Sequence, residues 1–322
     1  MTTKNFKIAL FASLTVALLA PFSVMESAYA EKVTDSLTIP NAERDLKLDA
    51  GYKLYPGVGW VSPNEQDRVQ PIYSENPNKP GEQILDIDAM IKQYELSEQA
   101  EVKKTSGDLF QDIYNQFVQI VEAAQTSYHI AAKDDSGNDI TYQRAYWNTP
   151  TAPGTYNGGT NFNFNAVEPY FGSGIIFQPV LQHGYSSYCD AGNDWVTYPL
   201  IYVLGSAYGG SCVDANDGDL IRGILSEDAN NVWTVSIKNY QNPAATDSYS
   251  VIYSGQMDVT HVAVETHNIP TNCTELEGDI EYKWMSTTGD VDNWAAMTQG
   301  STFCGMSTNI VSDSTVQFNN NN

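Results

Sequence analysis

The chain has 322 residues, with 16 lysines and arginines against 39 aspartates and glutamates, and a formal net charge of −23 at pH 7. This charge argues against partners such as nucleic acid or anionic membrane surfaces, because both attract positively charged proteins. The length is enough for one large domain or two modest ones.

The first 30 residues have the features of a secretory signal peptide. Lys4 and Lys7 precede the apolar run 8–20, and Ala28-Tyr29-Ala30 then forms a small-x-small cleavage site before Glu31. The apolar run is shorter than the roughly 20 residues that span a bilayer. We therefore expect a signal peptide over 1–30 and a secreted or periplasmic, monomeric protein with no membrane partner.

Residues 31–145 are expected to form an irregular and partly helical N-terminal segment, which is a candidate pro-segment. Residues 31–82 are polar and interrupted by prolines. In residues 83–128, apolar side chains recur every three or four positions, as in amphipathic helices. Thr105-Ser106-Gly107-Asp108 supplies a break and a cap between two such helices.

Residues 146–322 are predicted to form a β-sandwich domain. A stretch rich in Asn, Gly, Thr and Pro over 146–166 marks the boundary. Short apolar or alternating runs then follow one another, separated by Gly, Asn and Asp turns, which favours an antiparallel sandwich over a βαβ fold. The expected strands are 161–166, 174–183, 195–204, 219–226, 231–239, 248–254, 257–267, 280–286 and 315–318.

All four cysteines lie in this second half, and an even number in an exported chain predicts two disulfides. Four cysteines allow three pairings. The pairing Cys189–Cys212 with Cys273–Cys304 is favoured because each bond closes a local loop. The absence of any Cys-x-x-Cys pair argues against a zinc site.

Two glutamines stand out within an apolar strand. Alternation along residues 174–183 places Gln178, Val180 and Gln182 on one face of that strand, and Leu181 and His183 on the other. An amide in such surroundings must find hydrogen-bond partners or face a wet groove. The two readings are a structural glutamine and an amide aimed at a ligand, whereas His183 is interpreted as structural.

The motif Val180-Leu181-Gln182-His183-Gly184, together with Val262-Ala263-Val264-Glu265-Thr266, resembles the glutamic peptidases, or eqolisins. The resemblance is remote and covers residues 160–318. It implies a concanavalin-like, jelly-roll-like all-β sandwich preceded by the helical N-terminal segment. It also implies acid endopeptidase activity on a polypeptide substrate, with Glu265 as general base and acid and Gln182 as oxyanion donor.

The same resemblance identifies residues that line the groove. The strand that follows the family's glutamine corresponds to Tyr198-Pro199-Leu200-Ile201-Tyr202, which lacks the family's Trp and Glu, so the groove differs in its supporting residues. The groove candidates are Gln178, Tyr198, Tyr202, His261 and His267. His261, Glu265 and His267 share one strand face, but His261 lies roughly 13 Å along the backbone from Glu265. Two remaining ligands are too few for a metal ion, so the sequence predicts neither metal nor cofactor.

A second set of carboxylates competes with this reading. Glu277-Gly278-Asp279-Ile280-Glu281 resembles the Glu-x-Asp-x-Glu motif of laminarinase-like glycoside hydrolases, which act on polysaccharides. That resemblance implies Glu277 as nucleophile, Glu281 as acid/base and Asp279 as the residue that tunes them, all on one strand face. The other reading is an acidic loop after Cys273.

A third alternative is a non-catalytic, lectin-like domain. Tyrosines and tryptophans are frequent around the glutamine strand, and such side chains stack on sugars or grip peptides. Residues 151–322 also contain eighteen acidic and three basic residues. Such a surface repels itself at neutral pH and relaxes when its carboxylates are protonated, which fits an acid-active exported protein and equally a merely soluble one.

Overall fold

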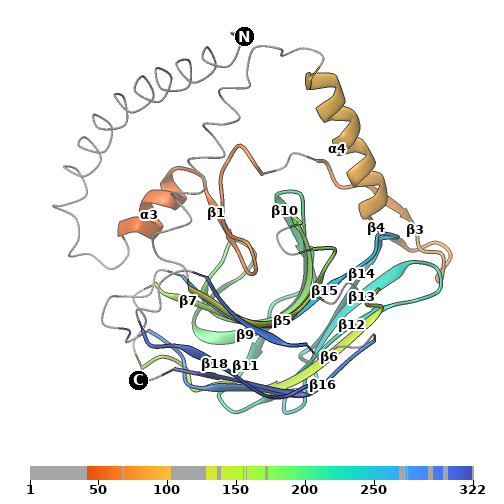
Figure 1. Cartoon of the computed structure of the whole chain (residues 1–322). Coiled ribbons are helices and arrows are strands. Elements are labelled where there is room, and N and C mark those ends of the chain that lie inside the picture. Colours follow the sequence, from red (N-terminus) through yellow and green to blue (C-terminus); the bar gives the residue numbers. More distant parts are fainter. Residues whose placement is uncertain are drawn as a thin grey trace, which may run out of the picture.

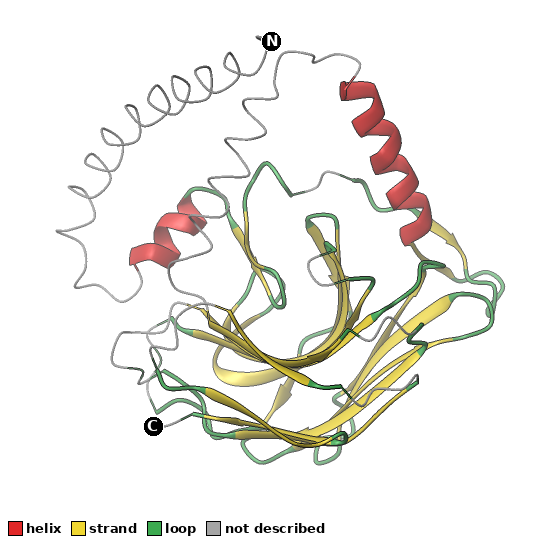
Figure 2. Ribbon diagram, in the orientation of Figure 1, coloured by secondary structure: helices red, strands yellow, loops and turns green. Residues whose placement is uncertain are grey.

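The computed structural model describes residues 42–320, except 67–68, 103–127, 136–138, 155, 157, 171–172, 268–272, 274, 289–292 and 300–303. The predicted signal peptide and the predicted helix around 109–121 lie outside the described residues. Strands dominate the described part, and two helices accompany them (Figure 2).

Eight strands form one sheet, here called sheet I. In spatial order they run β10, β9, β8, β7, β15, β5, β17, and β11 also pairs with β9; all of these pairings are antiparallel. The strands are β5 Tyr128–Asp134, β7 Thr160–Glu168, β8 Ile175–Tyr185, β9 Asp190–Val203, β10 Ser206–Gly209, β11 Val213–Ala215, β15 Val259–His267 and β17 Ala295–Gln299.

Nine strands form the second sheet, sheet II, in the order β18, β19, β16, β6, β12, β13, β14, β4, β3. Its pairs are antiparallel except β14 with β4. The strands are β3 Tyr73–Glu75, β4 Gln83–Asp86, β6 Tyr142–Asn148, β12 Leu220–Glu227, β13 Val232–Asn239, β14 Thr246–Ile252, β16 Ile280–Thr287, β18 Ser307–Ser312 and β19 Thr315–Asn319.

The two sheets stack face to face as a sandwich (Figure 1). Their facing side chains build two buried clusters, which contain Trp147, Leu181 and Val262 in one part and Phe177 and Trp233 in the other. In sheet II the strands alternate buried and partly exposed residues, as β13 shows, because the second face meets solvent. In sheet I, β7 and β15 are buried at every residue. Sheet I is therefore covered on both faces.

The cover on the outer face of sheet I is the N-terminal segment. It contains helix α3 (Ala42–Asp49) and a hairpin of β1 (Lys53–Tyr55) and β2 (Gly59–Val61), and the hairpin reaches into the concave side of sheet I (Figure 1). Leu54, Tyr55 and Val61 from the hairpin join a third buried cluster with the outer-face residues of sheet I. Helix α4 (Ile87–Val102) directly follows β4.

Most sequence expectations about strands are confirmed, and the sandwich fold is the predicted one. All nine expected strands are present with small shifts at their ends. The expected boundary at residue 146 falls inside β6, and β5 before it is a strand of sheet I. The helix expected from residue 83 begins at Ile87, since residues 83–86 form β4 on the edge of sheet II. The region 31–82, expected to be irregular, includes the hairpin.

Candidate active site

Strand register decides which side chains are neighbours on the outer face of sheet I. β7 lies between β8 and β15, and Phe162 pairs with Gln182 on one side and with Glu265 on the other. Gln182 and Glu265 are thus level with each other, roughly 10 Å apart at their backbones because each strand spacing is about 4.8 Å. Phe162 stands between them. Gln178 shares their face, and its place there is beside Ala166 rather than Phe162.

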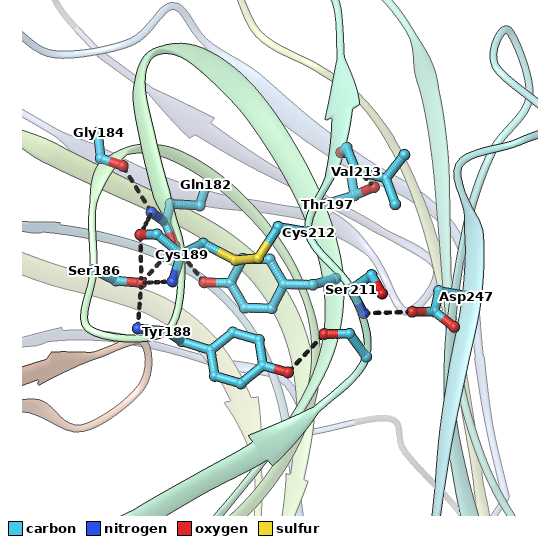
Figure 3. The surroundings of a disulfide bond; sticks show 12 residues. Gln182, Gly184, Ser186, Tyr188, Cys189, Thr197, Ser211, Cys212, Val213 and Asp247 are labelled. Carbon is cyan, nitrogen blue, oxygen red and sulfur yellow. Dashed lines mark hydrogen bonds between the residues drawn. A yellow bond between two sulfur atoms is a disulfide. The ribbon is translucent and has the colours of Figure 1, made fainter.

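The side-chain amide of Gln182 makes all of its hydrogen bonds with nearby residues (Figure 3). Its Nε2 donates to the carbonyls of Gly184 (2.7 Å) and Cys189 (2.9 Å). Its Oε1 accepts from Ser186 Oγ (2.9 Å) and from the hydroxyl of Tyr198. An amide has two N–H donors, so both are committed to backbone carbonyls. Gln182 fixes the turn before β9, beside the first disulfide, and has no N–H left for an oxyanion.

Gln178 has a different partner, which lies in the β1–β2 hairpin of the N-terminal segment. Its buried Nε2 donates to the carbonyl oxygen of Pro56 at 2.7 Å. Pro56 and Gly57 form the tip of the β1–β2 hairpin, where the Val58 N–H donates to the Tyr55 carbonyl at 3.4 Å. Proline at the second and glycine at the third position, with φ +75° at Gly57, define a type II turn. The central peptide group of such a turn leaves its own C=O and N–H free for outside partners.

Glu265 holds the other end of that peptide group. The Gly57 N–H donates to Glu265 Oε2 at 2.5 Å, and His267 Nε2 lies 2.7 Å from Oε1. His129 stands opposite Glu265 on β5. Burial acts to raise the pKa of Glu265, but His267, His129 and the Gly57 N–H outweigh it, so the pKa lies below its ordinary value. The carboxylate is therefore kept ionised although it is buried.

The Pro56–Gly57 peptide bond is consequently clamped between an amide and a carboxylate. Gln178 binds the carbonyl oxygen, and Glu265 binds the nitrogen. The fit at Gly57 is tight, because an added Cβ would lie 2.7 Å from Ile176 Cδ1 and 3.0 Å from Gln178 Oε1, and both side chains would have to shift. The positive φ at this position independently favours glycine.

The rest of the hairpin is anchored by backbone and aromatic contacts. The Leu54 N–H donates to Ser187 Oγ at 2.8 Å, and the Ser187 N–H donates to the Leu54 carbonyl at 2.9 Å. The ring of Tyr55 lies 5.7 Å from the ring of Tyr202 between centroids. The hairpin thus lies against the outer face of sheet I, held at one end by two hydrogen bonds to Ser187 and elsewhere by apolar contacts of its side chains.

The remaining groove candidates occupy the same face. Tyr198 bonds to Gln182, and Tyr202 contacts the hairpin, as described above. His261 lies 3.3 Å from Glu168 through Nδ1, and burial, with smaller effects of His129 and Lys133, lowers its pKa to about 3. His261 is therefore neutral at most pH values. His183 is on the inner face, where its ring packs 5.2 Å from that of Trp195, in keeping with the structural role expected for it.

The laminarinase-like motif does not place its acids on one strand face, which corrects that expectation. Glu277 precedes β16 and is buried, with its Oε2 accepting from Asn163 Nδ2 at 2.9 Å. Asp279 and Glu281 are exposed, and Glu281 accepts from Gln317 Nε2 at 2.8 Å. The reason is the irregular backbone at residues 276–279, which interrupts the alternation on which the expectation depended. A buried carboxyl and an exposed one have no common substrate face.

Both predicted disulfides are confirmed: Cys189 bonds to Cys212 and Cys273 to Cys304. Such bonds fit an extracytoplasmic chain. Within the described ranges, no three His, Cys, Asp or Glu side chains are grouped so as to hold a metal ion. The helices that can be described are too short or too polar to cross a membrane.

Sequence reasoning missed two parts of the site. The Pro56-Gly57 pair was a visible signal for a tight turn, but nothing in the sequence showed where that turn would dock. His129 lies in a strand that was not predicted, so its place opposite Glu265 was also missed.

Comparisons with known proteins found solved structures of weak similarity. No family model and no curated protein matches the chain. Among solved structures, scytalido-glutamic peptidase with a transition state analog inhibitor is similar, with a TM-score of 0.44 and 14% identity over 61% of this chain and 98% of the other. Aspergilloglutamic peptidase from Aspergillus niger gives 0.36 and 14% over 51% and 99%. Bacillus licheniformis β-glucanase gives 0.30 and 7% over 59% and 70%. Similarity this weak says nothing about the chemistry of the site.

Proposed function

We propose that this protein is an exported endopeptidase in which Glu265 and Gln178 act on a peptide bond, and that the β1–β2 hairpin occupies the groove as an internal inhibitor. One observation carries the proposal: a peptide group of the chain lies with its oxygen on the Gln178 amide and its nitrogen on the Glu265 carboxylate. The oxyanion role expected for Gln182 passes to Gln178, because Gln182 has already committed both of its N–H groups.

The contacts correspond to the two needs of peptide hydrolysis. Ionised Glu265 takes a proton from a water molecule, whose oxygen attacks the carbonyl carbon. The negative charge that develops on the carbonyl oxygen is stabilised by the N–H of Gln178, which already points at that oxygen. Glu265 then returns the proton to the amide nitrogen, the C–N bond breaks, and an amine and a carboxylic acid result. The hydrogen bond from Gly57 N–H to Glu265 marks the position of this leaving nitrogen.

The same contacts predict how the hairpin is released. The Gly57 N–H binds the ionised form of Glu265, which is one reason why the pKa of this carboxyl is lowered. Because the Gly57 N–H makes the pKa of Glu265 lower in the docked state than in the undocked state, this contribution to docking is complete above the undocked pKa. It is lost as the pH falls through the lowered pKa. Acid therefore weakens the inhibitor and exposes the groove. This supports an inhibitory role for the β1–β2 hairpin but not for all of residues 31–145, because β5 within that range belongs to sheet I.

The test is cleavage of denatured casein by the full exported chain after incubation at about pH 3–4, near the ordinary pKa of glutamate. We expect wild-type activity, and a loss of about 10²–10³-fold in Gln178→Ala, the usual cost of removing an oxyanion donor. Glu265→Gln should lose at least as much. Glu227→Gln, an isosteric change of a carboxylate at the end of β12 in sheet II, is the matched control and should retain activity.

Absence of cleavage by the wild type and by a variant with a loosened hairpin would overturn the proposal. It would leave a sandwich whose groove is permanently closed by its own N-terminal segment. Full activity in Gln178→Ala with loss in a folded Gln182→Met variant would instead restore Gln182 as the amide donor. The polysaccharide hydrolase is not proposed, because Glu277 and Glu281 face different surroundings.

A further inference from the structure

Within residues 129–322, positive charge is concentrated on the outer face of sheet II, away from Glu265 and Gln178. From residue 129 to the C-terminus the chain has five basic residues. Four of them, Arg144, Arg222, Lys238 and Lys283, are on this one face, and the fifth is Lys133 in sheet I. Strand register sets three of the four in a row with a tyrosine, since Arg222 pairs with both Lys238 and Tyr146, and Tyr146 pairs with Lys283. Such clustering is unexpected in a chain with a net charge of −23.

Aromatic rings are interleaved with these cations. The rings of Tyr146 and Tyr240 are 6.3 Å apart and those of Tyr146 and Trp284 are 5.4 Å apart between centroids. Tyr240 is 40% exposed and Trp284 is 58% exposed. Trp284 follows Lys283 in a stretch of β16 whose register shifts before Ser286, and its φ of +52° is rare for a bulky side chain. Bulges of this kind redirect a side chain, here a tryptophan that points into solvent.

The cations have no carboxylate partner within the described part of the chain, where the ion pairs involve other residues. Their near neighbours are the rings: Lys238 lies 4.8 Å from the Tyr240 ring centre, Lys283 lies 5.3 Å from that of Trp284, and Arg222 lies 5.8 Å from that of Tyr240. Cation–π contacts at exposed sites contribute only about 0.5–1 kcal/mol each. They do not explain why four cations gather where acidic residues are so much more abundant.

We propose that this cationic-aromatic face, formed by the residues Arg144, Tyr146, Arg222, Lys238, Tyr240, Lys283 and Trp284, binds an acidic polysaccharide whose pyranose rings bear carboxylates. Exposed aromatic rings stack on the apolar faces of sugars, and the cations supply partners for the carboxylates. The row from Lys238 to Lys283 crosses four strands, a length of about 14 Å, which suits an extended chain rather than a single small ion.

An acidic residue marks one edge of the cationic-aromatic face. Glu281 is on the same strand as Lys283 and two residues away from it, and it is exposed. The binding face therefore extends from Lys283 toward β12 and β13, where Arg222 and Lys238 lie. This inference is independent of the proposed peptidase activity, because it depends on the opposite surface of the sandwich and on no residue of the groove.

Affinity electrophoresis of the full exported chain in native gels that contain polygalacturonate tests the inference, with dextran as the neutral polysaccharide and poly-glutamate as the acidic peptide. We expect polygalacturonate to retard the wild type, and added salt to weaken the effect. Trp284→Ala and Arg222→Gln should each weaken binding by about tenfold, which corresponds to about 1.4 kcal/mol. Lys133→Gln, which removes a cation of sheet I outside the face, should bind as the wild type does.

Thermal unfolding midpoints of the variants establish that each is folded before its binding is interpreted. Failure of polygalacturonate to retard the wild type at low salt overturns the inference. Equal retardation of the folded Trp284→Ala or Arg222→Gln variants also overturns it. If poly-glutamate binds as tightly as polygalacturonate, with no effect of Trp284→Ala, the face is a plain anion-binding surface and the sugar assignment is wrong.

Discussion

Two buried glutamates on opposite faces of sheet I have opposite protonation behaviour. Glu265, on the outer face, is surrounded by His267, His129 and the Gly57 N–H, and its pKa lies below the ordinary value despite burial. Glu277 is buried against the inner face, where burial outweighs the hydrogen bond from Asn163 and raises its pKa to about 8. The difference shows that burial alone does not determine the protonation state of these two carboxyl groups. The available partners decide it: Glu265 has two histidines and a backbone N–H, whereas Glu277 has the amide of Asn163.

The strongest way to perturb the outer site is to displace its internal peptide. Gly57→Val adds a branched side chain where Ile176 Cδ1 and Gln178 Oε1 would have to shift, at a φ of +75°. Overpacking together with backbone strain should weaken hairpin docking by about 2–4 kcal/mol. We expect casein cleavage to begin at a higher pH than in the wild type, together with faster amide hydrogen exchange at Leu54 and Ser187.

A matched control for this variant is Gly81→Val. Gly81 has a similar φ of +87°, but nothing lies within 4 Å of an added Cβ. Its backbone strain is comparable, and its turn is remote from the groove. Gly57→Val with unchanged exchange at Leu54 and Ser187 would show that the hairpin is not held by the fit at its tip.

The inner glutamate predicts an effect of opposite sign and smaller size, a gain in global stability when its carboxyl group is replaced. Because the folded pKa of Glu277 is about 8 and thus above the ordinary value, the folded protein keeps a proton that the unfolded chain gives up. The stability associated with this group is complete below about pH 4.5, declines as the pH rises, and is lost as the pH passes through about 8. Glu277→Gln should therefore raise the free energy of unfolding by roughly 1–3 kcal/mol at pH 8 and change it little at pH 4.

Urea unfolding at both pH values measures this effect. Since Asn163 also bonds to an amide oxygen, the variant keeps that hydrogen bond. A variant that is destabilised equally at pH 4 and pH 8 would show that Glu277 is ionised in the folded protein, and the contrast between the two glutamates would disappear.

The smallest predicted effect concerns the partner that holds Glu265 ionised. Removing the imidazole in His267→Gln should raise the pKa of Glu265, because His267 is the largest of the groups that lower it. The midpoint of acid activation should move upward by about one pH unit, or about 1.4 kcal/mol. His261→Gln, on the same strand face but not among the groups that shift Glu265, should leave the midpoint in place. Equal midpoints in the wild type and His267→Gln would exclude this role.

The sequence by itself determined the sandwich and the faces of its strands. Alternating apolar residues between Gly, Asn and Asp turns fix strands locally, because each side chain's face follows from its position in the strand. That rule correctly placed Gln178 and Gln182 together, and His261 with Glu265 and His267. The disulfide pairing also followed from short loops.

Only the tertiary structure decided which of these groups meet. The difference between Gln178 and Gln182 depends on a hairpin more than 100 residues earlier in the chain and on a turn that takes both N–H groups of Gln182. The protonation of Glu265 depends on His129 from a strand paired across the sheet, and the burial of Glu277 depends on an irregular backbone. Contacts between segments that are distant in sequence depend on strand register and on where the hairpin docks. A local sequence pattern predicts neither of these.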